Sequence, residues 1–452
     1  MSALITEALK SATDTKVVLS EPGALAKLPA LFEEQFAGQS AVVVGDERTM
    51  QVAGDRVVSV LQEAGIDVIT HVFPGEPELY ARYENCESLR DVLRPMDRVA
   101  IGVGSGTLND TLKRACGELE RNYMVVGTAG SMDGYTAFGS SIALDGFKQT
   151  LSCPAPLVCV ADLDVMAAAP QVMTASGYGD LLGKIPAGAD WILADALGLE
   201  PIDRKVWDLV QGPLRQSLSR PSELAAGHVP AVGELVEGLL MSGLAMQAHQ
   251  SSRPASGAEH QFSHLWEMEG HGVDVTPRRL SHGFKVGIGS VAVAALYEDL
   301  LSRDLTALDI DAAVVAWPSR EAMEEQVRSL HPDPRLVEET VVQALAKWIA
   351  PEDLRKRLET LTGLWTDLVP RLREQLLSAA DLQARLRAVG APAHPSDIGL
   401  DWQRFKDTYT RAQMIRKRYT VLDVALEANL LEEIVVRLFA SDGFWGQQEQ
   451  EK

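Results

Sequence analysis

The chain has 452 residues, of which 46% are apolar, and a formal net charge of −21. This length predicts two or three domains with sizeable cores, and the acidic balance argues against nucleic acid as a partner because no basic stripe is present. The four cysteines lack metal-ligand spacing, the N-terminus lacks a signal-peptide pattern, and no window is expected to supply the roughly 20 apolar residues of a membrane span. We therefore expect a cytoplasmic protein without a membrane span.

Short β-rich runs alternate with amphipathic helical segments up to about Asp164. This alternation is typical of a parallel sheet with helices on its faces. The expected strands are 17–19, 40–46, 67–73, 98–104, 123–127 and 155–164. The expected helices between them are 23–35, 49–64, 77–92 and 107–120.

Beyond Asp164 helical periodicity takes over, and prolines separate the segments. We expect a buried central helix at Val286–Tyr297 and an amphipathic packing helix at Val421–Leu431. The sequence therefore predicts an α/β nucleotide-binding domain with a parallel sheet over residues 1–164, followed by an all-α domain over residues 165–452.

Two consecutive expected strands end in small and polar residues, at 104–108 and at 128–131. At such strand ends, backbone N–H groups beside a helix N-terminus face outward and can hold a pyrophosphate. The glycine spacing does not fit the GxGxxG fingerprint, because the frame that starts at Gly102 lacks its third glycine. The two turns together indicate an anion site, while tight backbone packing is the alternative for each of them.

Two aspartates lie at or beyond the ends of expected strands, and each has two interpretations. Asp46 precedes a helix, where it can accept hydrogen bonds from an adenine ribose or cap the helix. Asp133 can accept hydrogen bonds from a polyhydroxylated substrate or form an Asx-turn before Gly134. The sequence leaves both alternatives open in each case.

Five of the nine histidines fall between residues 249 and 282, namely His249, His260, His264, His271 and His282. His260 and His264 share one face of an expected helix, but the segment is not HExxH, which disfavours a zinc peptidase. Asp180 lies in a glycine-flanked segment and is expected to add a carboxylate, or else to cap a helix. A carboxylate and two imidazoles with an open position are typical of a catalytic metal site, while ordinary hydrogen-bonded histidines are the alternative.

The sequence resembles the bacterial branch of the glycerol-1-phosphate dehydrogenase family, within the iron-type alcohol dehydrogenase and dehydroquinate synthase fold group. The motifs that carry the resemblance follow one another in the order SGTLND, TAGSMDGY, DGFK, ADLDV, GYGDLLGK, SGAEHQFSHLWE and SHGFKVGIG. AVGAPAHPSDIGL and IRKRYTVLD extend it over nearly the whole chain. The resemblance implies a dehydroquinate synthase-like fold whose helical domain binds the metal and the substrate.

The resemblance also implies roles for individual residues. The metal ligands fall on Asp180, His260 and His282. Substrate contacts fall on Asp133, Asp180 and His264, and Asp180 and His264 are also the implied catalytic residues. Contacts to the nicotinamide cofactor are implied at Asp46, Gly104, Ser105, Gly106, Thr107, Leu108, Thr128, Ala129 and Ser131.

The implied reaction is reversible hydride transfer between a nicotinamide cofactor and dihydroxyacetone phosphate, which gives sn-glycerol 1-phosphate. NAD is weakly favoured over NADP by Asp46, and one divalent metal, zinc or nickel, is expected to act as a Lewis acid. The family often has serine where this chain has Ala137, which puts one cofactor hydrogen bond in doubt.

The resemblance also implies a homodimer. Candidates for binding the substrate phosphate, among which the sequence does not choose, are Lys148, Lys184, Lys285 and Arg416.

Other functions remain possible on the sequence alone. A sugar-phosphate cyclase of the dehydroquinate synthase type, or another polyol dehydrogenase of the same fold group, would share the metal site and the glycine-rich turns. A catalytically inactive binding protein is disfavoured, because Asp180, His260 and His282 are all present.

Overall fold

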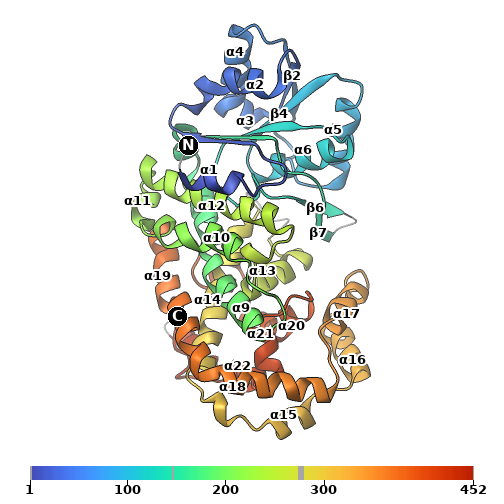
Figure 1. Cartoon of the computed structure of the whole chain (residues 1–452), viewed down its shortest axis with the longest axis vertical. Coiled ribbons are helices and arrows are strands. Elements are labelled where there is room, and N and C mark those ends of the chain that lie inside the picture. Colours follow the sequence, from blue (N-terminus) through green and yellow to red (C-terminus); the bar gives the residue numbers. More distant parts are fainter. Residues whose placement is uncertain (1–2, 145–146, 273–278, 451–452) are drawn as a thin grey trace. The chain divides into compact units, whose positions relative to one another are not determined.

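The structure is a computed structural model of the chain, and it describes residues 3–144, 147–272 and 279–450 (Figure 1). Within these residues the strands are β1 (Val17–Glu21), β2 (Ser40–Asp46), β3 (Val68–Phe73), β4 (Arg98–Gly104), β5 (Tyr123–Gly127), β6 (Ser140–Leu144), β7 (Phe147–Leu151) and β8 (Val158–Asp162). The α-helices as far as residue 249 are α1 (Ala3–Leu9), α2 (Leu28–Phe36), α3 (Glu47–Thr49), α4 (Asp55–Glu63), α5 (Tyr83–Leu93), α6 (Gly106–Glu118), α7 (Leu163–Ala167), α8 (Gln171–Leu182), α9 (Lys184–Ala196), α10 (Arg204–Ser217), α11 (Pro221–Ala225) and α12 (Val229–His249). The later α-helices are α13 (Ala258–Met268), α14 (His282–Leu301), α15 (Ile310–Ala316), α16 (Arg320–Leu330), α17 (Val337–Leu345), α18 (Pro351–Gln375), α19 (Ala379–Val389), α20 (Trp402–Met414), α21 (Val421–Glu427), α22 (Leu431–Leu438) and α23 (Phe444–Gln450).

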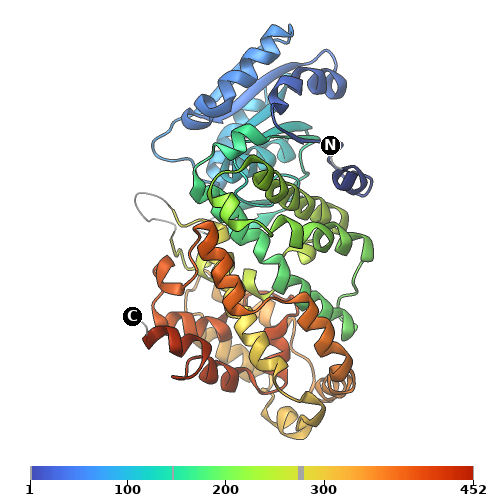
Figure 2. The same cartoon turned by 90° about the vertical axis from the view of Figure 1, so that its left-hand side faces the viewer.

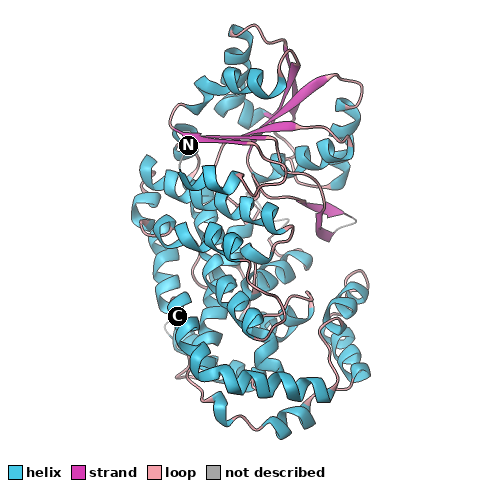
Figure 3. Cartoon of the chain, in the orientation of Figure 1, coloured by secondary structure: helices cyan, strands magenta, loops and turns pink. Residues whose placement is uncertain are grey.

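The chain forms two compact units. The first consists of Met1–Leu181, Lys205–Pro254 and Ala388–Gly390, and the second consists of Leu182–Arg204, Ala255–Arg387 and Ala391–Lys452. The last strand of the described residues, β8, ends at Asp162, two residues before Asp164, where the sequence predicts the change to helices (Figure 3). The units themselves are assembled from separate stretches of chain, so the division of roles between residues 1–164 and 165–452 remains a prediction.

The first unit contains a parallel six-stranded sheet in the order β1-β8-β5-β4-β2-β3. Its inner strands are continuous apolar runs, as expected for strands that are covered on both faces. On one face, Ile101 and Val126 pack in a cluster with Phe32 of α2 and Leu61 of α4. On the other face α6 approaches β4, and a Cβ atom on Gly102 would lie 2.5 Å from the side chain of Leu112. Since the strands are parallel, their carboxyl ends meet at one edge of the sheet.

The described residues of the second unit form helices joined by loops and turns, with no strand among them (Figures 2 and 3). Helix α13 packs against α14 and α20. Its aromatic face meets α20, with the ring of Phe262 5.0 Å from that of Tyr409 and 5.9 Å from that of Trp266. On the α14 side, a Cβ atom on Gly289 would lie only 2.5 Å from the backbone oxygen of Glu259. Helix α13 is therefore held between two neighbours at close range.

The predicted fold class is confirmed, and the expected strands 40–46, 98–104 and 123–127 match β2, β4 and β5 residue for residue. Two expected helices are wrong in extent. The helix expected over 77–92 begins only at Tyr83, and the one expected over 421–431 is divided into α21 and α22, with Asn429 at a φ of 56° between them. The antiparallel hairpin of β6 and β7 is not predicted.

Helix α12 corrects the expectation that no segment is long and apolar enough to span a membrane. It has 21 residues, and an 18-residue window within it has a mean hydropathy of 1.4. In the structure, however, 72% of that window is buried inside the protein. This burial is typical of a helix in the core of a folded unit.

Candidate active site

The two turns predicted to bind the cofactor lie side by side at the ends of β4 and β5. The backbone N–H of Thr128 donates to the carbonyl oxygen of Gly104 at 3.1 Å. The hydroxyl of Tyr135 donates to the carbonyl oxygens of Gly104 and Ala129, at 3.1 and 3.0 Å. These bonds hold the turns together, so that both can face one ligand.

Helix α6 begins directly after the first of these turns. Its N-cap residue, Ser105, makes no side-chain hydrogen bond to the helix. The N–H groups of the first turn therefore lack the usual side-chain cap, and the N-terminus carries a partial positive charge. These are the features of a helix start that suits a phosphate group, and the first turn contains Gly106, Thr107 and Leu108.

Asp46 caps helix α3. Its Oδ1 atom accepts hydrogen bonds from the N–H groups of Arg48 and Thr49, at 2.9 and 2.8 Å, and Thr49 completes a capping box. The capping interpretation thus describes this residue in the structure. The contact to an adenine ribose remains a prediction. The other carboxylate oxygen of Asp46 is available for it, because that oxygen is not part of the cap.

The turn after β5 packs directly on helix α8. The Ser176 hydroxyl donates to the carbonyl oxygen of Ser131 at 3.2 Å, and a Cβ atom on Gly177 would lie 1.9 Å from the carbonyl oxygen of Gly130. Only glycine at position 177 permits this approach. As a result the backbone N–H of Asp133 donates to Oδ2 of Asp180 at 3.2 Å, so two predicted site residues are in direct contact.

Buried polar groups hold the segment that follows. The Asp133 carboxylate accepts a hydrogen bond from the Ser242 hydroxyl at 2.8 Å. The ammonium group of Lys113, on α6, donates to the carbonyl oxygens of Gly134 at 2.8 Å and of Ala137 at 2.6 Å. Burial lowers the pKa of Lys113. The sequence alone does not single out Lys113 or Ser242, because neither belongs to a motif.

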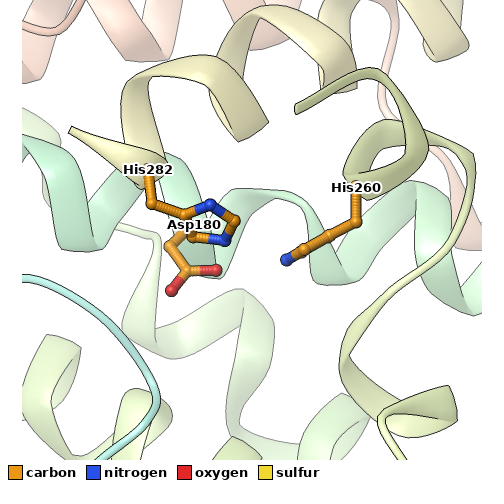
Figure 4. Close-up of side chains that lie close together, drawn as sticks. All are labelled: Asp180, His260 and His282. Atoms are coloured by element: carbon orange, nitrogen blue, oxygen red, sulfur yellow. The ribbon is translucent and has the colours of Figure 1, made fainter. Parts of the chain in front are cut away.

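Asp180 of α8, His260 of α13 and His282 of α14 come together, as Figure 4 shows. Each offers one ligand atom, and these atoms lie within 4.8 Å of one another. Asp180 is 1% exposed and His260 is 6% exposed. A carboxylate with two imidazoles suits several divalent cations, zinc among them. The donor set thus fits the metal that the resemblance implies, and the ligand role of the three residues remains a prediction.

His264 lies beside the two predicted histidine ligands. Its ring stacks on that of His282, with centroids 5.8 Å apart and an interplanar angle of 18°. Burial holds the pKa of His264 well below its ordinary value, and the charge of Arg416 lowers it further. The imidazole is therefore neutral near pH 7. His264, Glu267 and His282 also form a second group whose ligand atoms lie within 4.8 Å of one another.

Each of the two predicted histidine ligands has a buried glutamate at Nδ1. Glu259 Oε1 lies 2.7 Å from Nδ1 of His260, and Glu267 Oε1 lies 2.8 Å from Nδ1 of His282. Burial raises the pKa of Glu259 to about 7. The sequence alone does not single out these glutamates, although Glu267 lies seven residues beyond His260 and so falls on nearly the same helix face.

The other two histidines of the predicted cluster are engaged elsewhere. His249 bonds to the Ser251 hydroxyl at 2.7 Å, and His271 bonds to the carbonyl oxygen of Ile398 at the same distance. The cluster in the sequence therefore separates into three histidines at the candidate site and two that are held by other parts of the chain.

The four basic candidates for the substrate phosphate differ in their surroundings. The Lys148 side chain, like Asp145 and Gly146 of the DGFK motif, lies outside the described residues. Lys184 is fully buried, and its charge acts on Glu259, whereas Lys285 lies 3.5 Å from Glu267. The charge of Arg416 acts on His264 and on Glu267, and among the described residues none forms a hydrogen bond or an ion pair with Arg416.

Comparison with known proteins gives a consistent picture. A family model described as iron-containing alcohol dehydrogenase matches residues 19–170. The chain is 33% identical over 294 residues to a glycerol-1-phosphate dehydrogenase (NAD(P)+) of Bacillus licheniformis, an alignment that covers 65% of this chain and 73% of that protein. It is 31% identical over 397 residues to the protein of the same name from Bacillus subtilis, with 87% and 86% covered. The crystal structure of glycerol dehydrogenase from Schizosaccharomyces pombe has the same fold, with a TM-score of 0.60 at 18% identity over 98% of this chain and 93% of that one.

Proposed function

The chain belongs to the glycerol-1-phosphate dehydrogenase family, and from this we infer that it interconverts dihydroxyacetone phosphate and sn-glycerol 1-phosphate by hydride transfer with NAD or NADP. The observation that carries the proposal is the group formed by Asp180, His260 and His282, whose ligand atoms lie within 4.8 Å of one another. Three protein donors with an open position are typical of a catalytic rather than a structural metal site. The relatives described above are named dehydrogenases, which disfavours a sugar-phosphate cyclase.

In this proposal the carboxyl ends of β4 and β5 bind the cofactor. The uncapped first turn of α6 receives the pyrophosphate, and the turn at Thr128, Ala129 and Ser131 faces the same ligand. Asp46 contacts the adenine ribose through the oxygen that does not cap α3. Residues 1–164 thus bind the nucleotide, and residues 165–452 supply most of the metal and substrate contacts.

The substrate is held by side chains that belong to the predicted site. Asp133, which is oriented by Ser242, accepts a hydrogen bond from a substrate hydroxyl. Arg416 binds the phosphate, because its charge acts on His264 and its guanidinium forms no hydrogen bond or ion pair among the described residues. His264 is neutral near pH 7, so its imidazole can accept a proton from the substrate hydroxyl or return it.

Asp180, His260 and His282 hold the metal. When bound, the divalent cation supplies Lewis acidity at the reacting oxygen and the nicotinamide supplies or accepts the hydride. We further propose that the cation is zinc or nickel, that the enzyme is cytoplasmic and that it forms a homodimer. Asp180 is also proposed to contact the substrate, and its hydrogen bond with the backbone N–H of Asp133 supports this proposal.

The test is an assay of metal-stripped protein that has been reconstituted with zinc or nickel in turn. We expect stoichiometric oxidation of NADH or NADPH with dihydroxyacetone phosphate, because hydride transfer is the net reaction. Asp180→Ala and His260→Ala should each lower kcat/KM by about 100-fold or more, since loss of a ligand removes several kcal/mol of charge stabilisation.

Asp164→Ala and His228→Ala are matched controls, because they remove a carboxylate and an imidazole that lie on the surface. Both controls should retain metal and activity. Unchanged metal content and activity in Asp180→Ala and His260→Ala would contradict the site, and turnover without net oxidation of the cofactor would indicate a cyclase.

A further inference from the structure

Two glutamates lie behind the two histidines that we propose as metal ligands. Glu259 Oε1 lies 2.7 Å from Nδ1 of His260, and Glu267 Oε1 lies 2.8 Å from Nδ1 of His282. The glutamate side chains are only 0% and 5% exposed. The same arrangement, a buried carboxyl group on the Nδ1 side of an imidazole, thus occurs once on each histidine.

The partner of Nδ1 determines which nitrogen of an imidazole remains available to a cation. A carboxylate at Nδ1 accepts the N–H of that nitrogen, so the lone pair of the neutral ring is on Nε2. Such a partner also fixes the ring orientation and raises the basicity of the ligand. We propose that Glu259 and Glu267 are positioning residues that hold His260 and His282 as Nδ1–H tautomers, with Nε2 available to the divalent cation.

The backbone holds the first carboxyl group in place. The N–H of Gly257 donates to Glu259 Oε1 at 2.8 Å, so one oxygen is shared between the backbone and His260. A Cβ atom at position 257 would lie 2.9 Å from Glu259 Oε2 and 2.4 Å from Asp190 Oδ2. The glycine therefore leaves room for the glutamate to turn back on the start of its own helix and still reach the imidazole.

An ion pair holds the second carboxyl group, that of Glu267, in place. Lys285 Nζ lies 3.5 Å from the same Glu267 oxygen that contacts His282. The Ser263 hydroxyl lies 3.3 Å from Nδ1 of His282, so this nitrogen faces two oxygens, and the charged one is nearer. Hydrogen bonds to a charged acceptor are the stronger ones, which favours Glu267 as the group that sets the tautomer.

Glu267 has one alternative role. With His264 and His282 it forms the second group of ligand atoms, and in that role it would bind the cation itself. A ligand and a positioning residue differ in a measurable way. Loss of a ligand changes the coordination of the cation, whereas loss of a positioning residue lowers the affinity and leaves the same set of ligands.

The experiment measures Co²⁺ and Zn²⁺ binding to the folded, metal-stripped full-length protein by competition with a chelator, together with the visible absorption of bound Co²⁺. Glu259→Met and Glu267→Met remove the acceptor at similar volume, whereas Glu259→Gln and Glu267→Gln keep an acceptor oxygen without the charge. We expect the Met variants to bind about 10- to 100-fold more weakly and the Gln variants to be affected less, with the Co²⁺ spectrum preserved in all four. If a Met variant does not fold, the Gln variant at that position decides, and it should still bind several-fold more weakly than the parent.

Glu269→Gln is the matched control, because Glu269 follows the same helix but pairs with Arg404 and Arg411. It should leave the cation affinity unchanged. A thermal unfolding scan of each metal-free variant separates lost stability from lost affinity. Parental affinity in the glutamate variants would overturn the inference, as would a Co²⁺ spectrum in Glu267→Gln that differs from that of the parent, because such a change would mark Glu267 as a ligand.

The inference rests on the proposed function, since it requires a cation at Asp180, His260 and His282. The two can fail separately. If Asp180→Ala binds the cation as well as the parent does, the proposed metal site is wrong and this inference falls with it. If Asp180→Ala loses the cation while the glutamate variants keep parental affinity, only the positioning role is wrong.

Discussion

Arg416 carries a guanidinium whose charge acts on His264 and Glu267 of the candidate site, and it forms no hydrogen bond or ion pair among the described residues. We expect Arg416→Ala to raise KM for dihydroxyacetone phosphate by about 10- to 100-fold, because a hydrogen bond to a charged group contributes about 1.5–3 kcal/mol. KM for NADH should change little, since Arg416 is not among the residues that we propose to contact the cofactor. Steady-state kinetics with each substrate varied in turn check this.

The neighbouring Lys417 is exposed and supplies the control for Arg416. Lys417→Ala should leave both KM values as they are. An equal rise in KM for NADH and for dihydroxyacetone phosphate in Arg416→Ala would point to a general disturbance, and no rise at all would remove Arg416 from the phosphate site.

We expect His331 to make the stability of the protein depend on pH. It follows α16, is 2% exposed, and its Nε2 atom has no hydrogen-bond partner among the described residues. Burial lowers the pKa of His331 to about 4 from 6.5, and the charge of Arg411 adds to this. Between these two values the unfolded chain binds a proton that the folded chain does not bind, so stability is full above pH 6.5 and is lost as the pH falls towards 4.

Chemical unfolding at a series of pH values measures this effect. The shift corresponds to about 3 kcal/mol between pH 7 and pH 4, and His331→Gln should reduce the pH dependence by that amount. The same change at the exposed His228 should leave the pH dependence as it is. If the free energy of unfolding depended on pH in the same way in the parent and in His331→Gln, burial of His331 would not be a source of the pH dependence.

The contact between helices α13 and α14 depends on one glycine. A Cβ atom on Gly289 would lie 2.5 Å from the backbone oxygen of Glu259, and backbone atoms cannot turn aside as a flexible side chain can. We expect Gly289→Ala to push the helices apart, to lower the free energy of unfolding by about 1–3 kcal/mol and to weaken cation binding, because His260 and His282 lie on these two helices. Urea unfolding and chelator competition measure the two effects.

Gly363, in α18, is the control for this helix contact. No heavy atom lies within 4 Å of a Cβ atom built there, so Gly363→Ala should be neutral or should stabilise by up to about 1 kcal/mol through helix propensity. If both alanine variants changed stability in the same direction and by the same amount, close packing at Gly289 would not be the cause.

Secondary structure was predictable where the local signal was strong. Residues 40–46 and 98–104 are apolar runs between turn-forming residues, so they read as buried strands, and they are β2 and β4. The hairpin of β6 and β7 is polar where it begins, at Ser140 and Ser141, and its pairing depends on the partner strand rather than on its own pattern. The break between α21 and α22 depends on the positive φ of a single residue, Asn429, within a pattern that otherwise continues as a helix.

For the molecule as a whole, the order of the motifs along the chain predicted the family and the fold. Most contacts between residues that are distant in the sequence could not be predicted in this way. The motifs around Asp180, His260 and His282 were recognisable in the sequence, and these three side chains lie together. The role of Glu259 and Glu267 could not be predicted, because it depends on the orientation of their carboxyl groups toward Nδ1 of His260 and His282. Spacing along the chain does not encode that orientation. The burial of α12 is likewise a property of the folded unit, since its composition alone is that of a membrane span.

The order of strands in the sheet has a consequence for synthesis on the ribosome. β1 occupies an edge beside β8, and the Thr15 hydroxyl bonds to the carbonyl oxygen of Pro156, 141 residues later in the chain. At about 5–20 residues per second, roughly 7–28 s pass between the translation of these two residues. During that interval β1 lacks the strand with which it pairs in the sheet. Lys16 and Glu21 lie on either side of its short apolar run, and their charges limit pairing with other chains before β8 is made.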